Sequence, residues 1–216
     1  MADNRSKASS KDITAMLKEA GALLAITLVA GLLLGFVYEL TKEPRAHQKD
    51  LAIQNACAQV MPEAGKFTEK DYSLSEELKE ELSGIGVTIG TVYEAADPSG
   101  AFMGYVLEST SSEGYGGDIV LYLGIDPSSE PAVLTGVSIL SISETAGLGM
   151  RAGEVLVPQF NGKSVSEFTV TKTGSTADSE IDAISGATIT TKAVTNAVNG
   201  GLKAACELYQ SSKGGN

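Results

Sequence analysis

The sequence predicts an α+β fold, in which a mostly antiparallel sheet with flanking helices follows one N-terminal transmembrane helix. Three observations predict it. Residues 20–38 contain no charged side chain, residues 87–139 contain four runs in which apolar residues alternate, and helical periodicity appears on both sides of these runs. Consecutive alternating strands joined by turn residues favour antiparallel pairing, and helices that follow a sheet favour the α+β class.

The uncharged run Ala20–Tyr38 has 19 residues. At ~1.5 Å per residue it is long enough to cross the ~30 Å hydrocarbon core of a bilayer. A cleavable signal peptide has an apolar region of only ~7–15 residues and ends in small residues, whereas this run continues into Glu39 and Pro44. We therefore expect an uncleaved transmembrane anchor over residues 20–40, after a polar tail of residues 1–19.

Basic residues lie on both sides of this anchor, and those on the N-terminal side favour a cytoplasmic N-terminus. The large domain is then expected outside the cell membrane, with a single pass across it. The basic residues before the anchor are Arg5, Lys7, Lys11 and Lys18, and those after it are Lys42, Arg45 and Lys49.

The remainder divides into a helical linker region, 41–85, that packs on a domain of residues 86–209, followed by a flexible tail, 210–216. In the linker, helical periodicity over 46–62 stops at Met61-Pro62, and residues 74–82 form a charged helix. Alternation predicts strands at 87–93, 102–106, 119–123 and 133–139, and the last helix covers Ala193–Leu208.

Charge and cysteine content exclude several functions. The net charge is −11, and because residues 1–40 carry equal numbers of acids and bases, the excess lies in residues 41–216. Such an acidic domain repels nucleic acid. Cys57, Cys206 and His47 are the only cysteines and histidine, so no Cys or His metal cluster is available. A Cys57–Cys206 disulfide and two buried thiols both remain open, and redox work would need an organic cofactor.

The central motif is Asp182-Ala-Ile-Ser185-Gly186-Ala187-Thr188, directly before the last predicted helix. A glycine turn that opens a helix presents free N–H groups and the positive end of the helix dipole, which favour a phosphate or another anion. The alternative is that Ser185 or Thr188 simply caps the helix.

This motif resembles the flavinylation motif Asp-x-x-Ser/Thr-Gly-Ala-Thr of the FMN-binding domain family. The resemblance implies that Thr188 is esterified to the phosphate of FMN, with Ser185, Gly186 and Ala187 beside the cofactor. It leaves Asp182 to orient the acceptor, to help a flavin transferase, or only to cap the helix. Thr190 and Thr191 lie outside the motif and are poorer candidates for the acceptor.

Two glycine-rich loops complete the expected site. The loop Gly114–Asp118, which includes Tyr115, permits close approach of backbone to a ligand, although a tight hairpin turn is the alternative. The segment Glu144-Thr145-Ala146-Gly147-Leu148-Gly149 is similar to a Glu-Thr-Pro-Gly-Leu-Gly segment of the same family, with Ala146 in place of proline. The resemblance implies that Glu144, Thr145, Leu148 and Gly149 lie along the flavin.

A third loop, Gly162-Lys163-Ser164, suggests a P-loop, but the glycine that this motif requires five residues before Gly162 is replaced by Val157. The phosphate-loop interpretation fails. Lys163 remains a candidate contact to the flavin or its phosphate, with a solvated surface lysine as the alternative.

Over its whole length the chain resembles the G subunits of Rnf complexes, which are membrane-bound ion-translocating ferredoxin:NAD oxidoreductases. The related C subunits of sodium-translocating NADH:quinone oxidoreductases are generally longer between anchor and motif. The resemblance implies an FMN electron relay with no turnover on its own. Its partners are the other membrane and peripheral subunits and, during maturation, a flavin transferase. The alternative is a membrane-anchored domain that binds a ligand reversibly or acts as a sensor.

Overall fold

The computed structural model describes residues 3–214. Contacts divide the chain into two compact units, one up to Leu51 and one from Ala52 onward. Helix α1 (Asp3–Val60) supplies the first unit and the first residues of the second.

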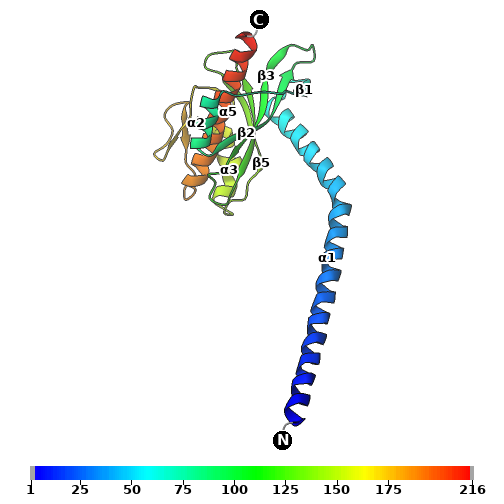
Figure 1. Cartoon of the computed structure of the whole chain (residues 1–216). Helices are drawn as coiled ribbons and strands as arrows, with labels where there is room; N and C mark the ends of the chain where they lie inside the picture. The colour runs from blue at the N-terminus through cyan, green and yellow to red at the C-terminus, as the bar shows by residue number, and fades with distance from the viewer. Residues whose placement is uncertain (1–2, 215–216) are drawn as a thin grey trace. The chain divides into compact units, whose positions relative to one another are not determined.

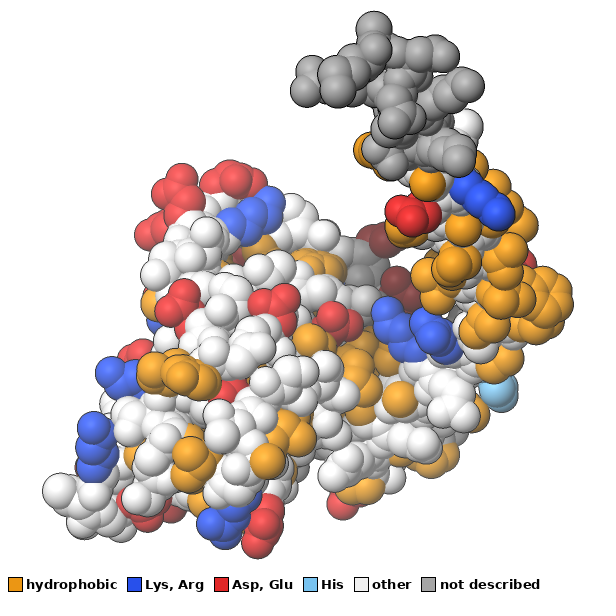
Figure 2. Space-filling view, turned by 90° about the horizontal axis from the view of Figure 1, so that it is seen from below, with side chains coloured by type: hydrophobic (Ala, Val, Ile, Leu, Met, Phe, Trp, Pro, Cys, Tyr) orange, Lys and Arg blue, Asp and Glu red, His pale blue; other side chains and the backbone are white. Residues whose placement is uncertain are grey.

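The first unit contains the apolar run. Within α1, the stretch that begins at Ile13 has a mean hydropathy of 2.4 in its most apolar window and none of that window is buried, so one helix is long and apolar enough to cross a membrane. Apolar side chains cover this helix in the space-filling view (Figure 2). A helix that is apolar and exposed on all sides suits a lipid environment.

The boundaries of α1 differ from the predicted ones. Residues 3–19 are helical and continuous with the apolar run, because Ala, Lys, Met and Leu in this segment are strong helix formers. The helix also includes Pro44, and so joins the apolar run to the helical segment predicted from residue 46. Proline there removes one backbone hydrogen bond and leaves the neighbouring turns intact.

The second unit contains a six-stranded antiparallel sheet in the sequential order β1-β2-β3-β4-β5-β6. The α+β class and the four central strands are confirmed. The edge strands β1 and β6 were not predicted, because they are too short to show alternation. The strands are β1 (Lys66–Glu69), β2 (Val87–Ala96), β3 (Phe102–Ser111), β4 (Ile119–Asp126), β5 (Val133–Ser141) and β6 (Lys163–Ser164).

Two helices lie on one face of this sheet. Helix α5 (Thr188–Gly214) packs along strands β2 to β4, and the shorter α2 (Glu76–Gly84) lies beside it (Figure 1). The large core between these helices and the sheet includes Leu107, Leu121, Leu123, Val194, Val198 and Leu202. Helix α5 continues to Gly214, so residues 210–214, expected as a frayed tail, are helical.

The end of α1 packs on the opposite face of the sheet. Its residues Ala56, Cys57 and Val60 contact Val106 and Tyr122. The backbone of Val60 lies against Gly124 and Gly136, which face each other on β4 and β5. The Thr135 hydroxyl donates to the Val60 carbonyl oxygen at 2.7 Å. This close approach fixes the end of α1 on the sheet.

Both cysteines are free thiols, and they lie in different parts of the domain. Cys57 belongs to the α1 face, where burial raises the pKa of its thiol to about 11. Cys206 is on α5 and packs against the core of the other face, where burial also raises its pKa. The sequence left open whether the two cysteines form a disulfide. In the structure they are separate thiols, and burial favours their protonated form.

The segment between β5 and α5 contains short elements that were not predicted. They are the 3-10 helix η1 (Gly149–Arg151), helices α3 (Ala152–Val155) and α4 (Val157–Phe160), and strands β7 (Thr169–Thr171) and β8 (Glu180–Asp182). β7 and β8 pair in parallel, apart from the main sheet. β8 carries the chain into the motif.

The Val60 contact predicts unequal effects of two glycine substitutions. In Gly124→Ala the new methyl group would collide with the Val60 carbonyl oxygen and lie 2.5 Å from the Thr135 hydroxyl. We expect the free energy of unfolding to fall by about 1–3 kcal/mol. Gly153→Ala in α3, whose methyl group meets nothing closer than 3.9 Å, is the matched control and should not destabilise. Urea denaturation of the full chain in detergent measures both, and equal effects would contradict the close packing.

Candidate functional site

The motif forms a tight turn between β8 and α5. The Ala187 N–H donates to the Ile184 carbonyl oxygen at 2.9 Å, and Gly186, the third residue of the turn, has φ +80°. This is the position at which a type II turn needs a positive φ and therefore glycine. Helix α5 then begins at Thr188. The turn places the motif threonine at the first residue of the helix.

The three threonines at this helix start differ in their hydrogen bonds. The Thr190 hydroxyl donates to Glu144 Oε2 at 3.0 Å. The Thr191 hydroxyl donates to the Ala187 carbonyl oxygen at 2.9 Å and accepts the Ile184 N–H at 3.1 Å. Within residues 3–214, no group hydrogen-bonds the side chain of Ser185 or of half-buried Thr188. Neither side chain caps the helix, so the capping interpretation is wrong for both.

Free backbone donors also gather at this point. Among the described residues, no backbone carbonyl accepts the N–H groups of Thr188, Ile189 and Thr190, and the first such bond comes from Thr191 N–H to Ala187. These donors and the positive end of the α5 dipole make the helix start attractive to an anion.

Glu144 joins the three predicted segments. One carboxylate oxygen accepts the Gly116 N–H at 3.2 Å, and the other accepts the Thr190 hydroxyl at 3.0 Å. The carboxylate thus connects the Gly114–Asp118 loop, the Glu144–Gly149 segment and the start of α5. The family resemblance implied only that Glu144 lies along the flavin, and the structure adds this bridging contact.

These segments enclose a cavity of about 540 Å³. Eight of the predicted site residues line it, and Ile189 and Thr190 are additional lining residues that the sequence analysis did not place in the cofactor site. Their position one and two residues after Thr188 was the signal that could have found them. The predicted residues in the lining are Tyr115, Glu144, Thr145, Leu148, Gly149, Gly186, Ala187 and Thr188.

The lining combines exposed apolar side chains with little charge. Tyr115, Leu148 and Ile189 are 73%, 40% and 53% exposed, which is unusual for such residues. Glu144 is the only charged residue among the described lining residues, and no Lys or Arg belongs to them. An apolar cavity with a few polar groups is the usual form of a cofactor site.

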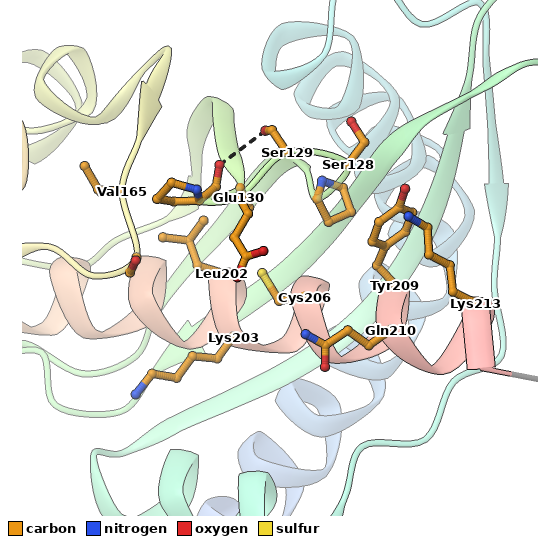
Figure 3. A pocket seen from close by; sticks show the side chains of 14 residues that line it. Ser128, Ser129, Glu130, Val165, Leu202, Lys203, Cys206, Tyr209, Gln210 and Lys213 are labelled. Atoms are coloured by element: carbon orange, nitrogen blue, oxygen red, sulfur yellow. Dashed lines mark hydrogen bonds between the residues drawn. The ribbon is translucent and has the colours of Figure 1, made fainter.

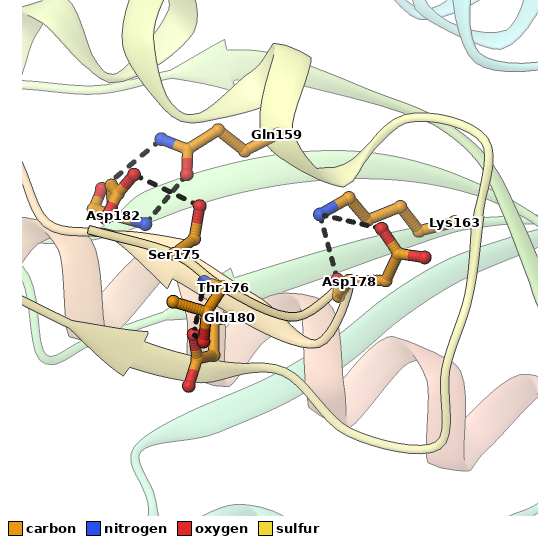
Figure 4. A network of polar contacts seen from close by, with 7 residues as sticks. All are labelled: Gln159, Lys163, Ser175, Thr176, Asp178, Glu180 and Asp182. Atoms are coloured by element: carbon orange, nitrogen blue, oxygen red, sulfur yellow. Dashed lines mark hydrogen bonds and ion pairs between the residues drawn. The ribbon is translucent and has the colours of Figure 1, made fainter.

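Three predicted site residues do not line this cavity. Ser185 is exposed on the turn. The Asp182 carboxylate accepts the Ser175 hydroxyl at 3.2 Å, and the Gln159 side chain bonds both the N–H and the carbonyl oxygen of Asp182 (Figure 4). Asp182 therefore fixes the strand before the turn.

Lys163 is also outside the lining. Its ammonium group donates to the Asp178 carbonyl oxygen at 2.9 Å and lies 4.0 Å from the Asp178 carboxylate (Figure 4). Lys163 is held there because it pairs with Leu134 at the edge of the sheet, on β6. Next to it, Thr176 donates its N–H and its hydroxyl to Glu180, and these bonds lower the pKa of that carboxyl.

A second cavity of about 440 Å³ lies near the C-terminal end of α5 (Figure 3). Its lining includes Glu130, Lys203, Cys206 and Tyr209, and none of the predicted site residues. The motif and the glycine loops therefore converge on the first cavity only.

Residues 114–203 match the FMN-binding domain family. The G subunit of the ion-translocating oxidoreductase complex of Methanosarcina acetivorans is 31% identical over 194 residues, which cover 88% of this chain and 93% of that protein. The G subunit of the proton-translocating ferredoxin:NAD(+) oxidoreductase complex of Clostridium ljungdahlii is 31% identical over 92% of this chain and 97% of that protein.

A third relative is the G subunit of the Na(+)-translocating ferredoxin:NAD(+) oxidoreductase complex of Acetobacterium woodii. It is 42% identical over 103 residues, and the match spans about half of each protein, 47% of this chain and 48% of the relative. The matched segment and the cavity together define an FMN-binding domain. The chain belongs to the family of G subunits of ion-translocating oxidoreductase complexes.

The bridging role of Glu144 is testable. Glu144→Met keeps a similar length but removes both acceptor oxygens, so the Gly116 N–H loses its partner. We expect its hydrogen exchange to accelerate roughly tenfold, the factor for about 1.4 kcal/mol. Glu144→Gln should stay close to the parent rate, because an amide can accept from Gly116 and donate to Thr190. Glu154→Met, at an exposed position of α3, is the control, and an unchanged Gly116 rate in Glu144→Met would contradict the bridge.

Proposed function

We propose that this protein is an electron-transfer subunit of an ion-translocating oxidoreductase complex, and that it carries FMN as a phosphoester on Thr188. The observation that carries the proposal is the hydroxyl of Thr188. It lies at the edge of the cavity, half-buried and without a hydrogen bond among residues 3–214, whereas the hydroxyls of Thr190 and Thr191 are both engaged.

The cavity suits the two chemically different ends of FMN. The exposed apolar side chains of Tyr115, Leu148 and Ile189 offer surfaces against which a flat aromatic ring can pack. The free N–H groups at the start of α5 suit the phosphate end. When bound, FMN supplies the one-electron redox chemistry, and the chain holds and orients it.

The charges of the lining favour covalent attachment over reversible binding. A free FMN phosphate is a dianion, and the described lining offers it no Lys or Arg, while Glu144 adds a negative charge. Phosphate sites that bind reversibly ordinarily use such cations. An ester bond to Thr188 keeps the cofactor in place without them. This argument also disfavours the alternative, a reversible ligand-binding or sensor domain.

Covalent attachment of FMN suits a domain that is anchored at the membrane. In this proposal the apolar part of α1 serves as a single transmembrane helix, and the basic residues before it favour a cytoplasmic N-terminus with the FMN domain outside. A tethered flavin cannot be lost by dilution there. The partners are the other subunits of the complex, together with a flavin transferase that attaches the cofactor.

The protein is expected to pass electrons between partners without turnover on its own. Glu144, the carboxylate in the cavity, is occupied by two hydrogen bonds. No cluster of three or more metal-ligating side chains occurs in the part of the chain that the structure describes. The translocated ion is left open, since one relative is named for sodium and another for protons.

Attachment is tested by intact mass. After co-expression with a flavin transferase and denaturation, the wild-type chain should gain the mass of FMN less one water, because the ester forms with loss of water. Thr188→Val should lose this increment entirely. Thr190→Val and Thr191→Val, which remove neighbouring hydroxyls from the same helix turn, are the matched controls and should keep it. A mass increment that persists in Thr188→Val would contradict the assignment of Thr188 as the attachment residue.

Orientation is tested by protease access. In sealed right-side-out membrane vesicles, an added protease should degrade the domain from Ala52 onward and leave the tail before the anchor protected. The opposite pattern is expected from inverted vesicles. Protection of the domain in right-side-out vesicles would contradict its place outside the membrane.

A further inference from the structure

Lys192 lies beside the proposed cofactor site but not in its lining. It is exposed on the first turns of α5, four residues after Thr188. It lines a hollow of about 480 Å³ together with Glu113, Ile189 and Asn196. Ile189 lines this hollow and the cofactor cavity alike, so the two are neighbours across one side chain.

Lys192 has no ion-pair partner in the part of the chain that the structure describes. Within residues 3–214, the ammonium groups of Lys70, Lys79, Lys163 and Lys203 each lie within 4.0 Å of a carboxylate, and that of Lys192 does not. Glu113 lines the same hollow but lies beyond that distance. A lysine ammonium without a partner, next to a site that lacks cations, is available for a new anion.

We infer that Lys192 is the counter-ion of the phosphodiester that joins FMN to Thr188, an inference that rests on the proposed function. Residues i and i+4 of a helix are neighbours, with their Cβ atoms about 5–6 Å apart. A long side chain on a helix also leans toward the N-terminus, over the residue four positions earlier. This spacing puts Lys192 and Thr188 on the same face of α5, so that a phosphodiester on Thr188 would lie within reach of the flexible Lys192 side chain.

Both the Lys192 ammonium and the α5 dipole would stabilise the negative charge of the phosphodiester. A phosphodiester carries one negative charge, which the free N–H groups at the start of α5 and the Lys192 ammonium would share. The contact is partly exposed, so its contribution is modest and salt weakens it. This role makes Lys192 a cofactor-binding residue that attachment creates, since its partner exists only after the ester has formed.

A thermodynamic cycle that combines FMN attachment with substitution of Lys192 tests the inference. The full chain in detergent is prepared with and without FMN, as wild type, Lys192→Met and Lys213→Met, and intact mass confirms each loading. Lys213→Met removes the same charge near the opposite end of the same helix and is the matched control. Thermal unfolding then gives the change in Tm that FMN causes in each chain.

The FMN-induced gain in Tm should be smaller by about 2–4 °C in Lys192→Met than in wild type, the shift for one partly exposed charge pair in a domain of this size. It should be unchanged in Lys213→Met, and Lys192→Arg should restore it. The difference between wild type and Lys192→Met should shrink in 1 M salt. An FMN-induced shift in Lys192→Met equal to that of wild type would overturn the contact.

Failure of attachment is also informative. If Lys192→Met takes up no flavin, the fraction attached becomes the measurement, and recovery in Lys192→Arg supports a need for a cation there. Loss in Lys192→Arg as well overturns the inference, because the charge is then not what matters. No mass increment in the wild-type chain would instead contradict the attachment itself.

Discussion

The hydrogen bonds of Glu144 are the interaction on which the rest of the site depends. One carboxylate holds a backbone N–H of the Gly114–Asp118 loop and the hydroxyl of Thr190, so two loops and the start of α5 are fixed to one another. Because Thr190 is bound in this way and Thr191 bonds the preceding turn, Thr188, at the first residue of the helix, is the one of the three whose hydroxyl has no hydrogen bond among the described residues. The arrangement therefore distinguishes one of three neighbouring threonines from the other two.

The cavity lining contains no Lys or Arg among the described residues, and the proposed attachment accounts for this lack of positive charge. The cofactor cavity has apolar walls, free N–H groups and one carboxylate, which suits a flavin ring better than a freely exchanging phosphate dianion. An acidic domain that attaches its cofactor needs no strong cationic cluster. Under the proposed attachment, Lys192, beside the cavity, would supply a single counter-ion for the monoanionic diester.

The fold could be predicted from sequence where the pattern was long. Alternation identified the four central strands, and the uncharged run identified the apolar helix. The strands β1 and β6 and the parallel pair β7 and β8 could not be found, because two to four residues carry no periodicity. The continuity of α1 through Pro44 was also not predicted, because proline is disfavoured in the interior of a helix.

The site was predicted in part, and for a reason that the residues make clear. A motif names residues that are near in sequence, and Asp182 and Ser185 were assigned to the site on that basis. The turn at Gly186 directs the chain so that Thr188 faces the cavity while Asp182 is bound to Gln159 and Ser175. Lys163 was proposed from its type alone, and Asp178 holds it elsewhere. Ile189 becomes a wall only through the three-dimensional arrangement of the loops.

The central claim is that Thr188 bears the flavin, and fragmentation of one peptide tests it most directly. Trypsin should release Thr173–Lys192 from the wild-type chain, a peptide with eight hydroxyl side chains. The account predicts that the C-terminal fragment Ile189–Lys192 has its unmodified mass and that the fragment Thr188–Lys192 carries FMN less one water. A flavin on the fragment Ile189–Lys192, or an increment that first appears N-terminal to Thr188, would contradict it.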